Sequence, residues 1–148
     1  MKVNAIGRAQ AKQLAVSPYF IENELLISIS TTLVEMEEMM EVAKEGIHTH
    51  FFHFGDVESQ EEISEGKGIL LFDEEHAQRI INIIKNLPLE IERIYVHCDA
   101  GVCRSGAVAE FIVDIMHLDR QEFVRLNPCI LPNIHVKRTL WRVLAQEA

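Results

Sequence analysis

The residues with the clearest chemical potential lie between positions 95 and 106, where Cys98 is followed six positions later by Arg104. Apolar β-forming residues run directly into Cys98, small and turn-forming residues follow it, and Arg104 and Ser105 then open an amphipathic segment. This order predicts a strand, a loop and a helix. A loop that closes onto a helix N-terminus turns several backbone N–H groups toward one point, where the helix dipole adds positive potential. The stretch therefore predicts a phosphate-binding site.

Two side chains in this stretch have the chemistry to act on a bound phosphate. Arg104 can contact two phosphate oxygens at once through its planar guanidinium, which lysine cannot reproduce. The thiol of Cys98, at a helix N-terminus beside a guanidinium, is expected to have a lowered pKa and to be largely thiolate at neutral pH. Because the thiolate is the form that attacks phosphorus, we expect a nucleophile at Cys98 and a phosphate clamp at Arg104.

The spacing of His97-Cys98, five further residues and Arg104-Ser105 resembles the signature of the cysteine-dependent protein tyrosine phosphatase superfamily. The resemblance implies that Cys98 is the nucleophile, that Arg104 binds phosphate, and that the Ser105 hydroxyl stabilises the thiolate as a leaving group. The implied phosphate-binding set is Asp99, Ala100, Gly101, Val102, Cys103 and Arg104. The alternative is a buried structural cysteine at a strand end, which is common for free cysteine but leaves Gly101, Arg104 and Ser105 unexplained.

Phosphoester cleavage also needs a proton for the departing oxygen, and Asp56 is the candidate donor. It lies just past an expected strand, upstream of the cysteine loop, and so matches by order the general acid of phosphatases whose cysteine motif comes late. The Trp-Pro-Asp tripeptide of the classical enzymes is absent, because the chain has Phe54-Gly55-Asp56 here. The dual-specificity branch tolerates that difference. Asp56 could instead cap a turn, and the competing carboxylates are Glu58, Glu61 and Asp73.

The layout separates relatives within the superfamily. A second cysteine, Cys103, directly before Arg104 resembles the low-molecular-weight phosphatases, but their loop is near the N-terminus, whereas here it lies about two-thirds along the chain. We therefore expect a small dual-specificity-like or bacterial-type tyrosine phosphatase that uses no metal and no cofactor. Two alternatives remain open: a non-catalytic phosphate-binding module, and a thiol-dependent sulfur transferase or reductase in which Cys98 cycles with Cys103 or Cys129.

The second thiol also raises a redox hypothesis. A low-pKa thiolate is readily oxidised to sulfenic acid, and a neighbouring thiol can trap that acid as a disulfide. Cys103 lies close enough in sequence to Cys98 for such a bridge, or it packs beneath the loop as a small apolar residue. The two interpretations stay open at this point.

Bulk properties limit the classes of function. The chain has 148 residues with 48% hydrophobic content, which is enough for a single domain over residues 1–148. The net charge of −9 argues against a nucleic-acid partner, which leaves a phosphorylated protein or a small phosphoester as the expected substrate. Three cysteines suit a reducing compartment. The sequence has no apolar leader or membrane-spanning segment, so we expect a cytoplasmic protein without a membrane partner.

The remaining pattern alternates strands with helices. Strands are expected at residues 3–6, 25–29, 47–54 and 91–97. Helices are expected at residues 8–16, from 33 to a stop at Gly46, after a cap at Asp73 as far as Lys85, after Gly106 to Met116, at 121–126, and after a cap at Asn133. This alternation predicts an α/β fold with a mostly parallel sheet of about four strands, helices on both faces, and ligands bound beyond the strand carboxyl ends.

Three further features have a plain structural interpretation. Met36, Met39 and Met40 at helical spacing could form a plastic partner surface, although a core role is more usual. The three histidines His48, His50 and His53 suggest a metal site, but alternation on a strand would split them between two faces, so we favour structural or surface roles. Residues 55–68 are polar and acidic without periodicity, which predicts a loop long enough to move.

Overall fold

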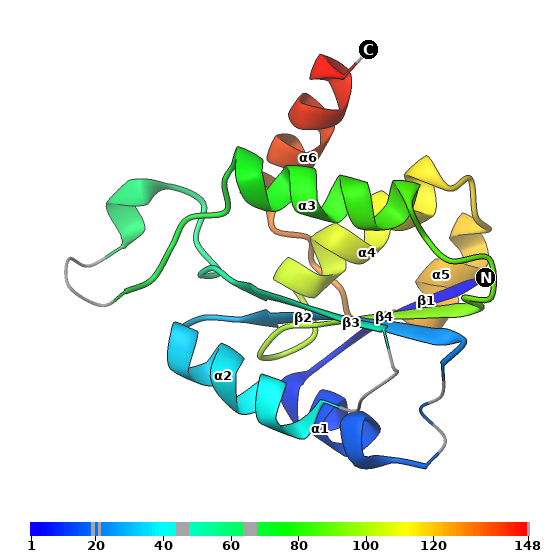
Figure 1. Ribbon diagram of the computed structural model, residues 1–148. Coiled ribbons are helices and arrows are strands. Elements are labelled where there is room, and N and C mark those ends of the chain that lie inside the picture. The colour runs from blue at the N-terminus through cyan, green and yellow to red at the C-terminus, as the bar shows by residue number, and fades with distance from the viewer. Residues whose placement is uncertain (19, 21, 44–47, 64–67, 148) are drawn as a thin grey trace.

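The architecture is a parallel sheet between two layers of helices (Figure 1). The computed structural model describes residues 1–18, 20, 22–43, 48–63 and 68–147. Its strands are β1 (Lys2–Ile6), β2 (Glu24–Ser30), β3 (His48–His53) and β4 (Arg93–His97), and all their pairings are parallel in the order β1-β4-β2-β3. The register pairs His97 with Ile6 on one side and with Ser28 on the other. The strand that leads to Cys98 therefore lies in the middle of the sheet.

The helices are divided between the two faces of the sheet. α1 (Arg8–Val16) and α2 (Leu33–Val42) cover one face, and α3, α4, α5 and α6 lie on the other (Figure 1). The second group comprises α3 (Glu74–Lys85), α4 (Arg104–Ile115), α5 (Arg120–Leu126) and α6 (Ile134–Gln146). This arrangement confirms the predicted α/β fold with helices on both faces. Among the described residues, no helix is long and apolar enough to cross a bilayer.

Helix α4 anchors the predicted phosphate-binding loop to the core. Every residue from Arg104 to Val113 is buried, because α4 packs on β1 and β4 and is covered in turn by α6. Phe111 at the centre of α4 meets the Trp141 ring of α6 edge-on, with centroids 5.0 Å apart. The loop between β4 and α4 runs directly into this buried helix, so the core holds its C-terminal end in place.

The Asn127 side chain closes the β1 edge of the sheet. Its Nδ2 donates to the Val3 carbonyl at 2.9 Å, and its Oδ1 accepts from the Ala5 N–H at 2.8 Å. A side-chain amide thus forms the two hydrogen bonds that a further strand would form there, which protects this edge from pairing with another chain.

Several element boundaries and one burial pattern differ from expectation. Helix α2 ends at Val42, before the predicted stop at Gly46, because Ala43 is already extended. Gly46 itself and Ile47 lie outside the described residues. Met39 is buried, but Met40 is 50% exposed and Met36 is intermediate, so the predicted core role holds fully for Met39 only. The cause is the position of α2 near the β3 edge, where the sheet covers only part of the methionine stripe.

The segment after β3 also contains more structure than predicted. A single 3-10 turn, η1 (Gln60–Glu62), interrupts it, and residues 64–67 lie outside the described part. The Gly55 N–H donates to the Leu70 carbonyl at 2.8 Å, which joins the two ends of the segment.

Candidate active site

The loop between β4 and α4 rests against the end of β1. The Cys98 N–H donates to the Ile6 carbonyl at 3.3 Å, and the Arg8 N–H donates to the Asp99 carbonyl at 3.1 Å. Gly101 adopts a φ of +77°, and a Cβ at this position would lie 2.5 Å from the Ile6 carbonyl carbon. Both the backbone conformation and the contact therefore require glycine. The sequence placed Gly101 in the predicted phosphate-binding set, and its packing on β1 gives it a structural reason.

Cys98 is 2% exposed and has a lowered thiol pKa. Burial acts to raise this pKa, but hydrogen bonds from the Ser105 side chain and backbone, the charge of Arg104 and the Gly101 N–H together outweigh it. The Ser105 Oγ lies 3.1 Å from the Cys98 Sγ, and the Gly101 nitrogen lies 3.3 Å from it. The structure therefore brings the predicted nucleophile and the predicted hydroxyl donor into contact and favours the thiolate.

His97 stiffens the strand end behind the nucleophile. Its Nδ1 lies 3.2 Å from the Cys98 carbonyl, and its Nε2 lies 2.6 Å from the Ser28 Oγ. Burial lowers the His97 pKa to about 4, so the imidazole is neutral near pH 7. Because a carbonyl can only accept, Nδ1 carries the proton and Nε2 accepts from the serine hydroxyl. His97 is thus a fixed link between β4, β2 and the loop.

The Arg104 guanidinium is buried and held on three sides. Its Nη1 donates to the Phe54 carbonyl at 2.7 Å and to the Thr31 Oγ1 at 3.0 Å, while its Nη2 lies 3.1 Å from the Asp99 Oδ2. Among the described residues, no atom accepts from its buried Nε. A buried donor without an acceptor is costly, so Nε is the donor with most to gain from a phosphate oxygen. Asp99, predicted within the phosphate-binding set, is therefore an ion-pair partner of Arg104.

A cavity of about 350 Å³ joins the two predicted parts of the site. The loop between β4 and α4 contributes Cys98, Asp99, Ala100, Val102, Cys103 and Arg104 to its lining. The remaining lining residues are Thr31, directly after β2, and Gly55, Asp56, Val57 and Ile69 from the segment after β3. Asp56 is exposed at this rim, and its Oδ1 accepts from the Asn133 Nδ2 at 2.8 Å. The predicted nucleophile Cys98, the predicted phosphate clamp Arg104 and the candidate acid Asp56 therefore line one cavity, together with apolar residues that include Val57, Ile69 and Val102.

The competing carboxylates lie elsewhere. Asp73 caps α3, where its Oδ1 accepts from the His76 N–H at 2.9 Å. Glu61 lies in η1, and the backbone of Glu58 is bonded to the Glu62 carboxylate at 2.8 Å. Among these four candidates, all of them in the described part of the chain, Asp56 alone lines the cavity. Its role as general acid stays a prediction.

Sequence reasoning missed two residues that contact this site. The Thr31 hydroxyl accepts from Arg104 and donates to the Asp99 carboxylate at 3.0 Å. Its signal was its place directly after a strand, at the sheet end where ligands bind. Asn133 was predicted as a helix cap only, and nothing in the sequence near it indicates that its side chain reaches Asp56.

Cys103 hydrogen-bonds the Asp56 side chain. The pKa of its thiol is raised, first by burial and then by the charge of Asp56, that hydrogen bond and the charge of Cys98, so Cys103 is neutral where Cys98 favours thiolate. Cys98, Cys103 and Cys129 are all free thiols. The Cys98–Cys103 disulfide stays a prediction.

The histidines of β3 are spread along the strand. The His48 Nε2 lies 3.7 Å from the Glu90 carboxylate, and His50 and His53 line a groove with Met36 and Met40. Within the described residues, no group of three or more histidine, cysteine, aspartate or glutamate side chains is arranged to hold a metal ion.

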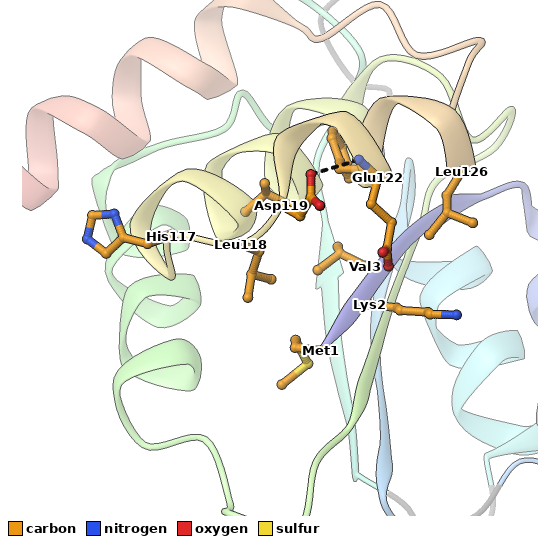
Figure 2. A pocket seen from close by; sticks show the side chains of 10 residues that line it. Met1, Lys2, Val3, His117, Leu118, Asp119, Glu122 and Leu126 are labelled. Atoms are coloured by element: carbon orange, nitrogen blue, oxygen red, sulfur yellow. Dashed lines mark hydrogen bonds between the residues drawn. The ribbon is translucent and has the colours of Figure 1, made fainter.

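A second cavity of about 490 Å³ lies at the opposite end of the sheet, between the start of β1 and the α4–α5 junction (Figure 2). Lys2, His117 and Glu122 are among the residues that line it. Asp119 also lines it, and its carboxylate caps α5 by accepting a hydrogen bond from the Glu122 N–H at 3.1 Å. It contains none of the predicted site residues. The predicted site residues therefore line the cavity at the carboxyl end of the sheet and not this one.

Comparison with known proteins gives a result at the level of fold. No family model matches the chain, and no curated protein matches it either. A crystal structure of PTPMT1 matches with 15% identity and a TM-score of 0.51, covering 99% of this chain and 94% of that chain. A crystal structure of PTPMT1 in complex with PI(5)P matches with 14% identity and a TM-score of 0.49, covering 99% and 95%. The chain has an α/β fold of the protein tyrosine phosphatase-like type.

Proposed function

We propose that this protein is a phosphoester hydrolase that acts through a cysteinyl-phosphate intermediate. The observation that carries the proposal is the environment of Cys98: a buried thiol with a lowered pKa contacts Ser105 and shares a cavity with the Arg104 clamp and the Asp56 carboxylate. A structural cysteine has no need of these neighbours. The phosphatase-like fold is consistent with the proposal.

The first step is an in-line displacement. The Cys98 thiolate forms a bond to phosphorus as the bond to the leaving oxygen breaks, and the Asp56 carboxylic acid transfers its proton to that oxygen. The loop N–H groups and Arg104 stabilise the charge on the equatorial oxygens. The products of this step are a free alcohol or phenol, a cysteinyl phosphate and an Asp56 carboxylate.

The second step restores the enzyme. Water attacks the phosphorus while the Asp56 carboxylate takes its proton, and the sulfur–phosphorus bond breaks to release inorganic phosphate and the thiolate. The Ser105 hydroxyl, 3.1 Å from the sulfur, stabilises that thiolate as it leaves. Charge neutralisation in both steps comes from Arg104 and backbone amides.

The cavity walls favour an aromatic leaving group. Val57, Ile69 and Val102 present apolar surface beside the phosphate site, and such surface suits a phenyl ring better than a short polar chain. We therefore propose phosphotyrosine in a protein as the preferred substrate, with other phosphoproteins and small phosphoesters as weaker ones.

The test is the Cys98→Ser variant with an aryl phosphate as substrate. Turnover should be abolished while vanadate still binds, because a serine hydroxyl is not ionised at neutral pH. Cys129→Ser, which alters an exposed thiol, is the matched control and should retain full turnover. Appreciable turnover by Cys98→Ser would exclude the mechanism. A wild-type protein that binds vanadate without turnover would indicate a binding module, and thiol chemistry without phosphate release would indicate a sulfur transferase or reductase.

A further inference from the structure

Asn133 caps α6 at the point where the segment after β3 that carries Asp56 meets the loop between β4 and α4. It is 5% exposed. Its backbone N–H donates to the Cys103 carbonyl at 3.0 Å, which fixes it to the residue directly before Arg104. Its side chain reaches in the other direction, to the segment after β3. Asn133 thus bridges two parts of the cavity that come from distant parts of the sequence.

The surrounding groups determine the orientation of its side-chain amide. The Oδ1 accepts from the Val136 N–H at 3.0 Å, and a backbone N–H can only donate. The Nδ2 donates to the Val57 carbonyl at 3.2 Å, and a carbonyl can only accept. These two contacts exclude the flipped amide. The Nδ2 is therefore the atom that lies 2.8 Å from the Asp56 Oδ1 and donates to it.

We propose that Asn133 is a positioning residue that holds Asp56 for proton transfer, an inference that rests on the proposed function. Asp56 is exposed, and two neighbours restrict the rotamer of its carboxylate, the Cys103 thiol and the more deeply buried Asn133 amide. The amide donor occupies Oδ1, and since a carbonyl oxygen is the better acceptor, this contact favours the tautomer of the neutral acid whose proton is on Oδ2. Asn133 thereby selects both the place of the acid and the oxygen that carries its proton.

The cap of α6 does not by itself require asparagine. Capping uses only Oδ1 as acceptor, and aspartate and serine cap helices about as well as asparagine does. The donor function of Nδ2 belongs to the contact with Asp56 and Val57. A substitution that keeps the acceptor and removes the donor therefore separates the two roles.

The decisive variant is Asn133→Asp, which keeps the size and the cap and replaces the donor with a carboxylate facing Asp56. It should lower turnover of a poor leaving group such as an alkyl phosphate by about tenfold to a hundredfold, since misplacement by about 1 Å has effects of that size. Turnover of p-nitrophenyl phosphate should fall less than threefold, and the affinity for vanadate should fall by no more than about fivefold, the effect of one added carboxylate charge. Asn133→Ser, with a shorter side chain, should show the same selectivity.

Two controls separate positioning from a structural role. Asp119→Ala removes the cap of α5, in which the Asp119 Oδ1 accepts from the Glu122 N–H at 3.1 Å. It should lower thermal stability without altering the ratio of the turnover rates on the two substrates. In an Asp56→Asn background, Asn133→Asp should cost less than a factor of two, because no acid remains to be positioned.

The outcomes distinguish the inference from the proposed function. Equal loss on both substrates, an undiminished loss in the Asp56→Asn background, or wild-type activity of Asn133→Asp would each overturn the inference while leaving the phosphatase intact. A wild-type protein that hydrolyses neither substrate would overturn both together.

Discussion

The two halves of the cavity are built in different ways. Cys98 and Arg104 are 2% and 3% exposed, and their loop is held by hydrogen bonds to the backbones of Ile6 and Arg8 and by a buried helix. Asp56 is exposed, and its described contacts are hydrogen bonds between side chains. The proposed phosphate-binding part is therefore an extension of the core, whereas the proposed proton donor lies at the exposed edge of the cavity. Substitutions in the loop should therefore change ligand affinity or stability, whereas a substitution at Asp56 should change the rate of turnover.

Asp56→Asn tests the rim and should give the largest change in rate. Turnover of a poor leaving group should fall by about 10²- to 10⁴-fold, the usual contribution of general acid catalysis, with little effect on p-nitrophenyl phosphate. Stability should not change, because the side chain is exposed. Steady-state kinetics on both substrates measures this, with Glu58→Gln as the neighbouring control. An equal response of both substrates would mean that another carboxylate is the acid.

Arg104→Lys tests the core side and should reduce affinity and rate together. We expect a loss of about 10²- to 10³-fold in rate, comparable with removal of one oxyanion-hole donor, and weaker vanadate inhibition because the planar fork is lost. Arg79→Lys is the matched control, since Arg79 also donates to a backbone carbonyl, that of Phe51 at 2.9 Å, but lies outside the cavity. An unchanged vanadate affinity would show that the guanidinium does not bind phosphate.

Gly101→Ala tests how firmly the loop is joined to β1. The methyl group would meet Ile6 at 2.5 Å at a φ of +77°, so we expect a loss of about 2–4 kcal/mol in the free energy of unfolding from overpacking and left-handed strain. Gly68→Ala is the matched control: it has a φ of +66° but no atom within 4 Å of the added carbon. Urea unfolding of both variants should show the smaller loss for Gly68→Ala. Equal losses would remove the contact with β1 from the explanation.

Asp99→Asn should have the smallest effect and the opposite sign. The Asp99 side chain is 47% exposed and lies 3.1 Å from the Arg104 Nη2. In the proposed function it would compete with the phosphate for this nitrogen. Its removal should tighten vanadate binding by about two- to fivefold, the range of a partly exposed ion pair. Added salt should shrink the difference. Weaker binding would show that Asp99 supports the clamp more than it competes with the ligand.

Local sequence patterns were sufficient to predict most of the secondary structure of this protein. Apolar runs with turn residues around them predicted the four strands, and the order of strand, small residues and arginine predicted the loop around Cys98. The place of Asp56 followed from its position at a strand end. In contrast, the contact of Thr31 with Arg104 depends on β2 lying beside β4 in the sheet. The contact of Asn133 with Asp56 joins residues 77 positions apart, which no local pattern predicts. The exposure of Met40 likewise depends on where the sheet stops, which no local pattern encodes.

The support of the loop around Cys98 by β1 bears on when the proposed site forms during folding. The hydrogen bond from Cys98 to Ile6 joins segments separated by most of the described chain. Arg104 also depends on Thr31 and Phe54, which lie 73 and 50 residues before it. Contacts of such sequence separation form slowly, because a long loop must close before they can stabilise it. During refolding, helical circular dichroism should therefore recover before vanadate binding does. A partly folded chain would contain the complete Cys98–Arg104 sequence and still lack a usable phosphate cradle.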